Sequence, residues 1–244
     1  MKNKPVFFIP RENLSRTTRL ICFPFAGGNA TFFYSWLDLL PKNIELVAIQ
    51  LPGRGMRLGE QHFISMSEMA DEIASQIAPH TADCDYMFFG HSMGAPLAYE
   101  VTCRLSRPNI RLPQKLILSS SIPPHKINIS ERFSNDASFI ENIISYGGIP
   151  KEIQQNKEML DFFLPSLKCD FEILKQYRNV TKKQILTDIE FCYAEDDCSL
   201  QTEYLSEWQK YTKGNFNCTK FSGGHFFIES KKESFLKHLN KILT

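Results

Sequence analysis

Short apolar runs alternate with amphipathic stretches along most of the chain. Six runs are almost continuously hydrophobic, which is typical of strands covered by helices on both faces. These runs are Arg19–Phe25, Ile44–Leu51, Tyr86–Gly90, Lys115–Ser119, Asp188–Tyr193 and Phe216–Phe221. Because helical patterns separate them, the alternation predicts an α/β fold, with a mostly parallel central sheet and helices on both of its faces.

Two helical patterns are the clearest. Apolar residues recur at helical spacing from Met66 to Ile77, and Ser65 before them, with Glu68 three residues further on, forms a capping-box pattern. A last helix, at about 232–243, carries its apolar residues on one stripe. Such stripes indicate surfaces packed against a core.

The alternation breaks between Ile122 and about Gln184. A stretch of this length is too long for a loop inside a compact domain. We therefore expect one domain over residues 1–244, with a helical lid inserted at about 122–184 over the carboxyl edge of the sheet, where open α/β sheets place their sites. Such a lid can shape a pocket and exclude water. The alternative is a helical appendage that does not contact substrate.

The segment Gly90–Gly94, with the sequence GHSMG, lies between a predicted strand and a predicted helix. This is the context of a nucleophile elbow, in which a sharp turn lifts the central serine above the sheet and glycines avoid crowding the backbone. It makes Ser92 the candidate nucleophile. The alternative is a glycine-rich turn with an inert serine.

A serine nucleophile needs a base, and in this class of hydrolase the histidine comes after the serine in the chain. The candidates are His125, His225 and His238. His225 follows the last strand and Gly223-Gly224, so we predict it to be the base. We expect His238 to be a solvated residue on the polar side of the final helix, and His125 to fit a pocket role better than a base role.

An acid must orient the histidine and stabilise its protonated form. The penultimate strand ends in three adjacent carboxylates, Glu195, Asp196 and Asp197. Composition leaves the choice among them open.

An oxyanion requires backbone N–H donors, one from the residue after the nucleophile and one from the loop after an early strand. Met93 is the first candidate. In the loop Phe23–Gly28, Ala26 or Phe25 is the second. The glycines of this loop are not a dinucleotide fingerprint, because the sequence holds no G-x-G-x-x-G.

Together these motifs resemble the type II thioesterases of nonribosomal peptide and polyketide synthases, within the α/β-hydrolase superfamily. The resemblance is carried by Leu20–Gly28, Gln50–Glu60, Phe88–Glu100, Tyr193–Asp197 and Phe221–Phe227. The 122–184 region is also similar to the helical cap of the family. Its acid typically follows a strand-end glycine by three residues, and Ala194 stands at that glycine's position here, which implies Asp197, with Asp196 as the alternative.

The resemblance implies hydrolysis of acyl thioesters on the phosphopantetheine arm of acyl or peptidyl carrier proteins, which clears misprimed or stalled groups. Ser92 would attack, His225 would act as base, and the N–H groups of Ala26 and Met93 would hold the oxyanion. No metal or dissociable cofactor is implied, because the pantetheine belongs to the substrate. The alternatives are a carboxylester or acyl-CoA hydrolase or acyltransferase with the same triad, and an inactive hydrolase fold that serves as a binding module.

The net charge and the cysteine content limit which partners and which cellular compartment we expect. With 28 Lys and Arg against 27 Asp and Glu, the net charge is +1, which gives no footprint for nucleic acid or a membrane surface. Seven cysteines without a C-x-x-C pair, and no signal-peptide or membrane-length run, favour a cytoplasmic protein. We expect a monomer that recognises its carrier through a local basic patch near Arg54, Arg57 and Lys126.

Overall fold

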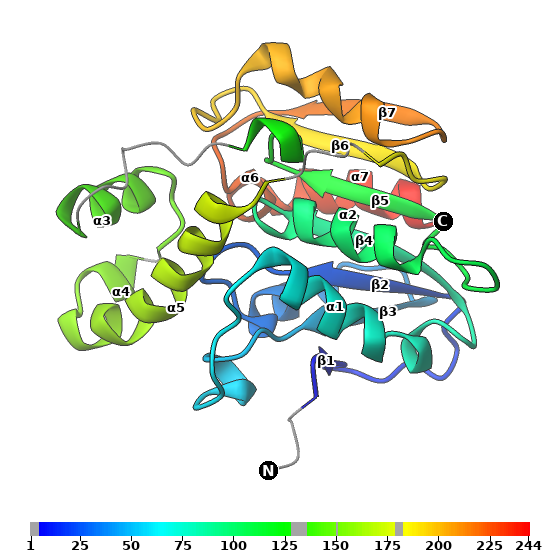
Figure 1. Cartoon of the computed structure of the whole chain (residues 1–244), viewed down its shortest axis with the longest axis horizontal. Coiled ribbons are helices and arrows are strands. Elements are labelled where there is room, and N and C mark those ends of the chain that lie inside the picture. Colours follow the sequence, from blue (N-terminus) through cyan, green and yellow to red (C-terminus); the bar gives the residue numbers. More distant parts are fainter. Residues whose placement is uncertain (1–4, 128–135, 150, 179–182) are drawn as a thin grey trace.

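A seven-stranded sheet forms the centre of the computed structural model, which describes residues 5–127, 136–149, 151–178 and 183–244 (Figure 1). The strand order is β1-β3-β2-β4-β5-β6-β7, and every neighbouring pair is parallel except β1 with β3. The strands are β1 (Phe7–Phe8), β2 (Thr18–Phe23), β3 (Ile44–Ile49), β4 (Asp85–His91), β5 (Lys115–Ser119), β6 (Asp188–Ala194) and β7 (Phe216–Phe221). The predicted α/β fold with a mostly parallel sheet is confirmed.

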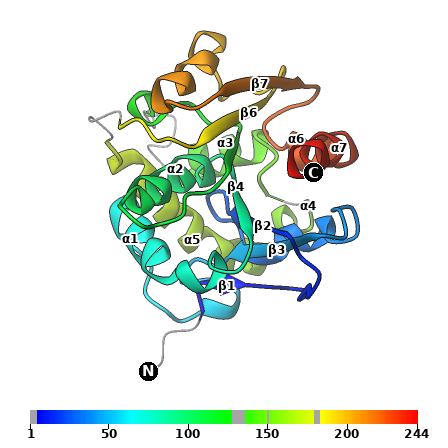
Figure 2. The same cartoon turned by 90° about the vertical axis from the view of Figure 1, so that its right-hand side faces the viewer.

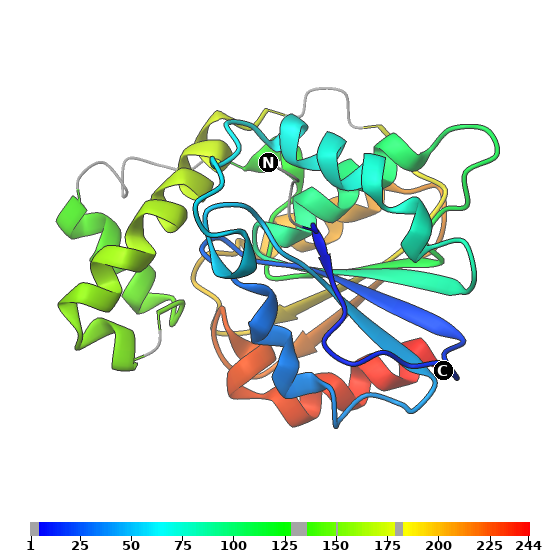
Figure 3. The ribbon, with the colours of Figure 1, turned by 90° about the horizontal axis from the view of Figure 1, so that it is seen from below.

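Helices cover both faces of this sheet (Figures 2 and 3). On one face lie α1 (Met66–Gln76) and α2 (Gly94–Leu105), and on the other lie α7 (Lys232–Leu243) and the 3-10 helix η1 (Ala30–Trp36). The predicted cap of α1 is confirmed, because the Ser65 hydroxyl accepts from the Glu68 N–H at 3.1 Å. Shorter helices are η2 (Gly55–Arg57), η3 (Ala78–His80), η4 (Pro124–Lys126), η6 (Thr202–Tyr211) and α6 (Phe227–Ser230). No described helix has the length and apolar character to span a membrane.

The two faces of the sheet explain the unbroken apolar runs. Successive strand residues point to opposite faces, so Phe88 of β4 packs in the core beneath α1 and α2, while Phe89 packs in the core beneath α7. The Phe89 ring lies 5.1 Å from Trp36 and 5.5 Å from Phe235 between centroids. Each central strand therefore needs apolar residues at consecutive positions.

Three helices lie beyond the carboxyl ends of the parallel strands, to the left in Figure 1. They are α3 (Asp136–Ser145), α4 (Lys151–Gln154) and α5 (Lys157–Gln176). They share a small core of Phe139, Ile143, Ile149 and Leu167. The predicted insertion at 122–184 is helical in its described part, while residues 128–135, 150 and 179–182 lie outside the description.

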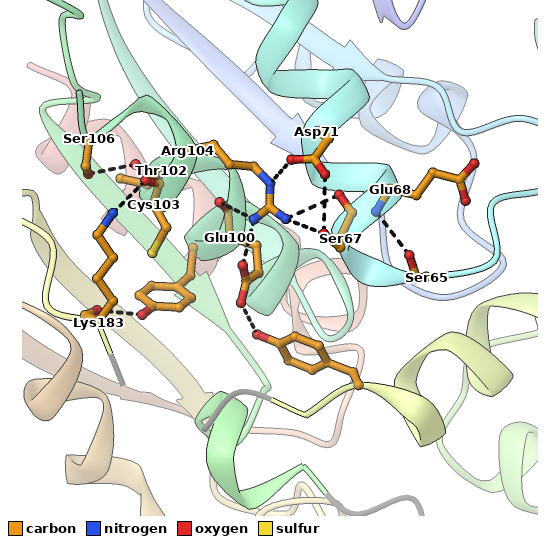
Figure 4. Close-up of polar contacts among 12 residues, drawn as sticks. Ser65, Ser67, Glu68, Asp71, Glu100, Thr102, Cys103, Arg104, Ser106 and Lys183 are labelled. Atoms are coloured by element: carbon orange, nitrogen blue, oxygen red, sulfur yellow. Dashed lines mark hydrogen bonds and ion pairs between the residues drawn. The ribbon is translucent and has the colours of Figure 1, made fainter. Parts of the chain in front are cut away.

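A polar network joins α5 to the helices that cover the sheet (Figure 4). The hydroxyl of Tyr177, just after α5, donates to Glu100 of α2 at 2.6 Å. Arg104 of α2 donates to Glu100 at 2.7 Å and to Asp71 of α1 at 2.5 Å. The end of α5 is thereby linked to α2, the helix that begins at the predicted nucleophile elbow.

Candidate active site

Ser92 occupies the turn between β4 and α2. Its φ is 53°, in the left-handed region that residues other than glycine rarely adopt. The Ser92 N–H donates to the Ser119 carbonyl at the end of β5, at 2.8 Å. The neighbouring strand thus holds the strained turn in place, as a nucleophile elbow requires.

The two glycines of the turn are explained by close backbone approaches. A Cβ on Gly90 would lie 2.2 Å from the carbonyl oxygen of Gly94, and a Cβ on Gly94 would lie 2.3 Å from that of Phe23. No other residue fits either position without moving backbone. The second approach also places the loop after β2, with its predicted oxyanion donor, beside the elbow.

His225 and Asp197 come together from the loops after β7 and β6. His225 Nδ1 lies 3.0 Å from Asp197 Oδ2 and 3.1 Å from Oδ1, and both side chains are buried. Asp196 has an exposed side chain, and its N–H donates to the Gly223 carbonyl. Glu195 is exposed and pairs with Lys220. Of the three adjacent carboxylates, Asp197 is thus the one bonded to the histidine.

Two further serines, which the sequence reasoning missed, contact this pair. The Ser199 hydroxyl donates to Asp197 Oδ1 at 2.6 Å and lies 3.0 Å from His225 Nδ1. Ser120, at φ 46°, donates from its hydroxyl to the His225 carbonyl at 3.2 Å. The Asp-x-Ser spacing could have indicated Ser199, because aspartate commonly bonds the backbone two residues on.

These contacts set the charge of the acid. Burial alone would raise the pKa of Asp197, but hydrogen bonds from His225 and Ser199, together with the charge of His225, lower its pKa below the usual range. Asp197 is therefore ionised at neutral pH and suited to hold a proton on His225 Nδ1.

A second histidine lies under the site. His91 is fully buried, its Nδ1 lies 3.0 Å from the Ser119 hydroxyl, and its ring centroid is 5.2 Å from that of His225. Burial, and then the charge of His225, lower the pKa of His91 well below its usual value. A neutral His91 adds no repulsion when His225 takes up a proton.

Ser92 and His225 line one cavity of about 650 Å³. Its wall also includes Met93, the serines that follow β5, and residues of the helical insertion, among them Phe171 and Leu174 of α5. The lining residues are Ser92, Met93, Ser120, Ser121, Ile122, Lys126, Ile127, Tyr146, Phe171, Leu174, Cys198, Ser199, Leu200, Gln201, Tyr204 and His225. A cavity of this size falls in the range of small-molecule sites.

The predicted oxyanion donors lie on the two segments that meet beside Ser92. Met93 directly precedes the first residue of α2. In the loop after β2, the Gly27 N–H donates to Asp170 at 2.8 Å and the Gly28 N–H to the Phe25 carbonyl at 2.8 Å. The assignment of Ala26 rather than Phe25 stays a prediction.

The prediction of a basic patch that contacts the carrier is wrong for two of its three residues. Arg54 is 7% exposed and pairs with Asp170 of α5, while Arg57 is 2% exposed and pairs with Glu60 and Glu72. Both guanidinium groups are buried and engaged in ion pairs, so neither is available to a carrier. Lys126 does border the cavity, 4.6 Å above the Tyr204 ring.

The other two candidate histidines are bonded elsewhere. His238 was expected to be solvated, but this is wrong: its side chain is 26% exposed and its Nε2 lies 3.0 Å from Glu190 Oε1. His125 Nδ1 lies 2.7 Å from the Tyr211 hydroxyl. Neither lines the cavity that holds Ser92.

One group of three potential metal ligands occurs among the described residues. The ligand atoms of Glu190, Cys192 and His238 lie within 4.8 Å of one another. Burial raises the pKa of the Cys192 thiol well above its usual value, and a protonated thiol is a poor ligand. That no metal or cofactor is needed stays a prediction.

The sheet, the elbow at the end of β4 and the histidine–carboxylate pair at the same edge define an α/β hydrolase. A family model described as a thioesterase domain matches residues 18–243. The chain belongs to this thioesterase family.

Curated and solved relatives agree with this assignment. The chain is 30% identical to the human S-acyl fatty acid synthase thioesterase, medium chain, over 97% of its length and 91% of the relative's. It is 29% identical to linear gramicidin dehydrogenase LgrE of Brevibacillus parabrevis, over 96% of its length and 90% of the relative's. The structure of RedJ, a thioesterase of prodiginine biosynthesis in Streptomyces coelicolor, superposes with a TM-score of 0.87 at 32% identity, covering 98% of this chain and 91% of RedJ. The resemblance to type II thioesterases is confirmed.

Proposed function

We propose that this chain is a type II thioesterase that hydrolyses acyl thioesters from the phosphopantetheine arm of acyl or peptidyl carrier proteins. The observation that carries the proposal is the meeting of Ser92, on its strained turn, with the bonded pair His225 and Asp197 at one cavity. The similarity to RedJ, a thioesterase of the prodiginine biosynthetic pathway, supports a role for this chain in a biosynthetic pathway.

The reaction begins when the Ser92 hydroxyl attacks the thioester carbonyl and His225 Nε2 takes its proton. Asp197 holds the remaining proton on Nδ1 and stabilises the imidazolium. Backbone N–H groups of Met93 and Ala26 bind the oxyanion. When the C–S bond breaks, the imidazolium gives its proton to the thiolate, and the pantetheine thiol leaves on its carrier.

Water then completes the cycle. His225 takes a proton from the water as its oxygen attacks the acyl-serine carbonyl, and returns the proton to the Ser92 oxygen as the free acid leaves. The cavity wall contributed by Phe171 and Leu174 supports a lid role for the inserted helices, which would shape the acyl site and limit access of water. Lys126, at the cavity, is suited to an anionic group of the carrier arm.

Two rival functions are compared with this proposal: the first differs from it in substrate, and the second differs in the reaction catalysed. The first is hydrolysis of a simple ester or of acyl-CoA by the same residues. The second is the dehydrogenase activity named for LgrE, which would require a dinucleotide. The absence of a G-x-G-x-x-G sequence gives no support to that second function.

The test compares three substrates with one enzyme preparation. Acyl-loaded carrier protein, acyl-CoA and an aryl ester are each incubated with the chain, and free acid and carrier mass are followed by mass spectrometry. We expect the acyl-carrier to give the largest kcat/KM and Ser92→Ala to abolish turnover. Rapid ester turnover with an untouched carrier would refute the proposed substrate.

A further inference from the structure

Asp170 of α5 is a buried carboxylate that touches two loops of the α/β core. Its side chain is 1% exposed. Arg54, in the loop after β3, donates from Nη2 to Oδ1 at 2.8 Å and from Nη1 to Oδ2 at 2.5 Å. The Gly27 N–H, in the loop after β2, donates to Oδ2 at 2.8 Å. One carboxylate therefore joins the helical insertion to two loops of the core.

The strength of this contact comes from its burial. The Arg54 guanidinium is 8% exposed, so its positive charge is largely shielded from water and needs a partner. Breaking a buried pair by removing one member is strongly unfavourable, because the other charge remains uncompensated. Displacement of α5 would separate Asp170 from Arg54 and leave the Gly27 N–H without its acceptor.

The Gly27 contact lies next to the proposed oxyanion donor. Gly27 follows Ala26 directly, has a φ of 74°, and leaves no room for a side chain. A Cβ there would lie 2.7 Å from the Phe163 ring and 2.9 Å from Leu167, both on α5. The helix thus packs onto this loop while its carboxylate fixes the peptide that follows Ala26.

The carboxyl end of the helix is held as well. Tyr177, just after α5, bonds Glu100 of α2, whose place in the network of α1 and α2 is shown in Figure 4. Because α2 starts at Gly94, beside Met93, α5 is attached to both segments that carry the predicted oxyanion donors.

We propose that Asp170, held by Arg54, is a positioning residue for the oxyanion site, so that this site is complete only when α5 is docked on the loop after β2. The inference rests on the proposed function, since it takes the Ala26 N–H as a donor to the oxyanion. It assigns the inserted helix a role in transition-state stabilisation in addition to the cavity wall.

The test uses Asp170→Asn, which keeps the size of the side chain and an acceptor for the Gly27 N–H but removes the charge. Three quantities are measured: kcat and KM on an aryl thioester, the affinity of an alkyl boronic acid that forms a tetrahedral adduct with Ser92, and the affinity of a thioether analogue without a carbonyl. We expect kcat and boronate affinity to fall by about 10- to 100-fold, because small displacements of catalytic groups have effects of this size. Thioether affinity should stay within about twofold, because it does not use the oxyanion site.

Asp161→Asn is the matched control. It makes the same change on an exposed position of α5, so all three quantities should remain at wild-type values. If Asp170→Asn fails to fold, Arg54→Lys carries the test, because it keeps the charge and loses the two-pronged contact. The same selective loss is expected, by about 10-fold.

The outcomes separate this inference from the proposed function. A wild-type enzyme that binds the boronate but leaves acyl-carrier intact would refute the proposed substrate alone. A folded variant of Asp170 or Arg54 with unchanged kcat, or with equal loss of boronate and thioether affinity, would overturn the positioning role.

Discussion

Replacing Asp197 with asparagine tests the orienting acid with the smallest change in shape. The Asp197 carboxylate accepts hydrogen bonds from His225 Nδ1, from the Ser199 hydroxyl and from the Ser199 N–H. An amide that keeps the Ser199 contacts turns its NH₂ group toward His225. The imidazole then accepts at Nδ1 and carries its proton on Nε2, which can no longer take the proton of Ser92.

The expected loss of kcat is large, because Asp197→Asn leaves His225 in a tautomer that cannot act as base and also removes the negative charge that stabilises the imidazolium. The same substitution in a serine protease triad lowers kcat by about 10⁴, and we expect a fall of that order here. This corresponds to about 5 kcal/mol in the activation free energy. Asp196→Asn should keep kcat within about twofold, because Asp196 is exposed and only its backbone N–H contacts the neighbouring loop.

The assay follows hydrolysis of an acyl thioester by its ultraviolet absorbance, because a thiol reagent would also label the exposed Cys198 and Cys218. Circular dichroism and thermal unfolding establish that both variants are folded. A larger loss for Asp196→Asn than for Asp197→Asn, or a loss below about tenfold for Asp197→Asn, would refute the assignment of the acid.

Three other changes have defined outcomes. Ser199→Ala should lower kcat by about tenfold with little change in KM, since it removes one hydrogen bond that holds Asp197; an unchanged kcat would contradict this contact. Gly90→Ala should abolish soluble expression or lower Tm severely, because its Cβ would meet the Gly94 carbonyl at 2.2 Å, and a folded variant with normal Tm would contradict the elbow geometry. The lowered pKa of His91 means that, as pH falls through 6.5, the unfolded chain takes up a proton at this residue, approaching one in full, that the native chain does not bind. The free energy of unfolding, measured in urea, should therefore decrease from pH 6.5 to 5 with a slope of up to about 1.4 kcal/mol per pH unit from this group, and His91→Asn should reduce that slope.

The sheet could be predicted from the sequence because its strands are buried on both faces. Consecutive residues such as Phe88 and Phe89 enter different cores, and this produces the unbroken apolar runs. The edge strand β1 was not predicted, because a two-residue pairing has no distinctive pattern of its own. Its position depends on the antiparallel contact with β3, which is distant in sequence.

In the site, too, residues with a local sequence signature could be predicted, whereas residues placed by distant contacts could not. The elbow and His225 have local signatures in their glycines and in their position after strands. Asp197 could not be separated from its neighbours by composition, since its burial arises only when the loops after β6 and β7 meet. Arg54 was expected at the surface because its partner, Asp170, lies 116 residues away on the inserted helix.

The central claim is that Ser92 receives the acyl group from a carrier protein. Acyl-loaded carrier is mixed with the enzyme, the reaction is stopped early, and the intact enzyme and its peptides are weighed by mass spectrometry. The account predicts an added acyl mass on the peptide that contains Ser92, and neither acyl-enzyme nor free acid with a folded Ser92→Ala variant. An acyl group on another residue such as Cys198, or turnover retained by Ser92→Ala, would contradict it.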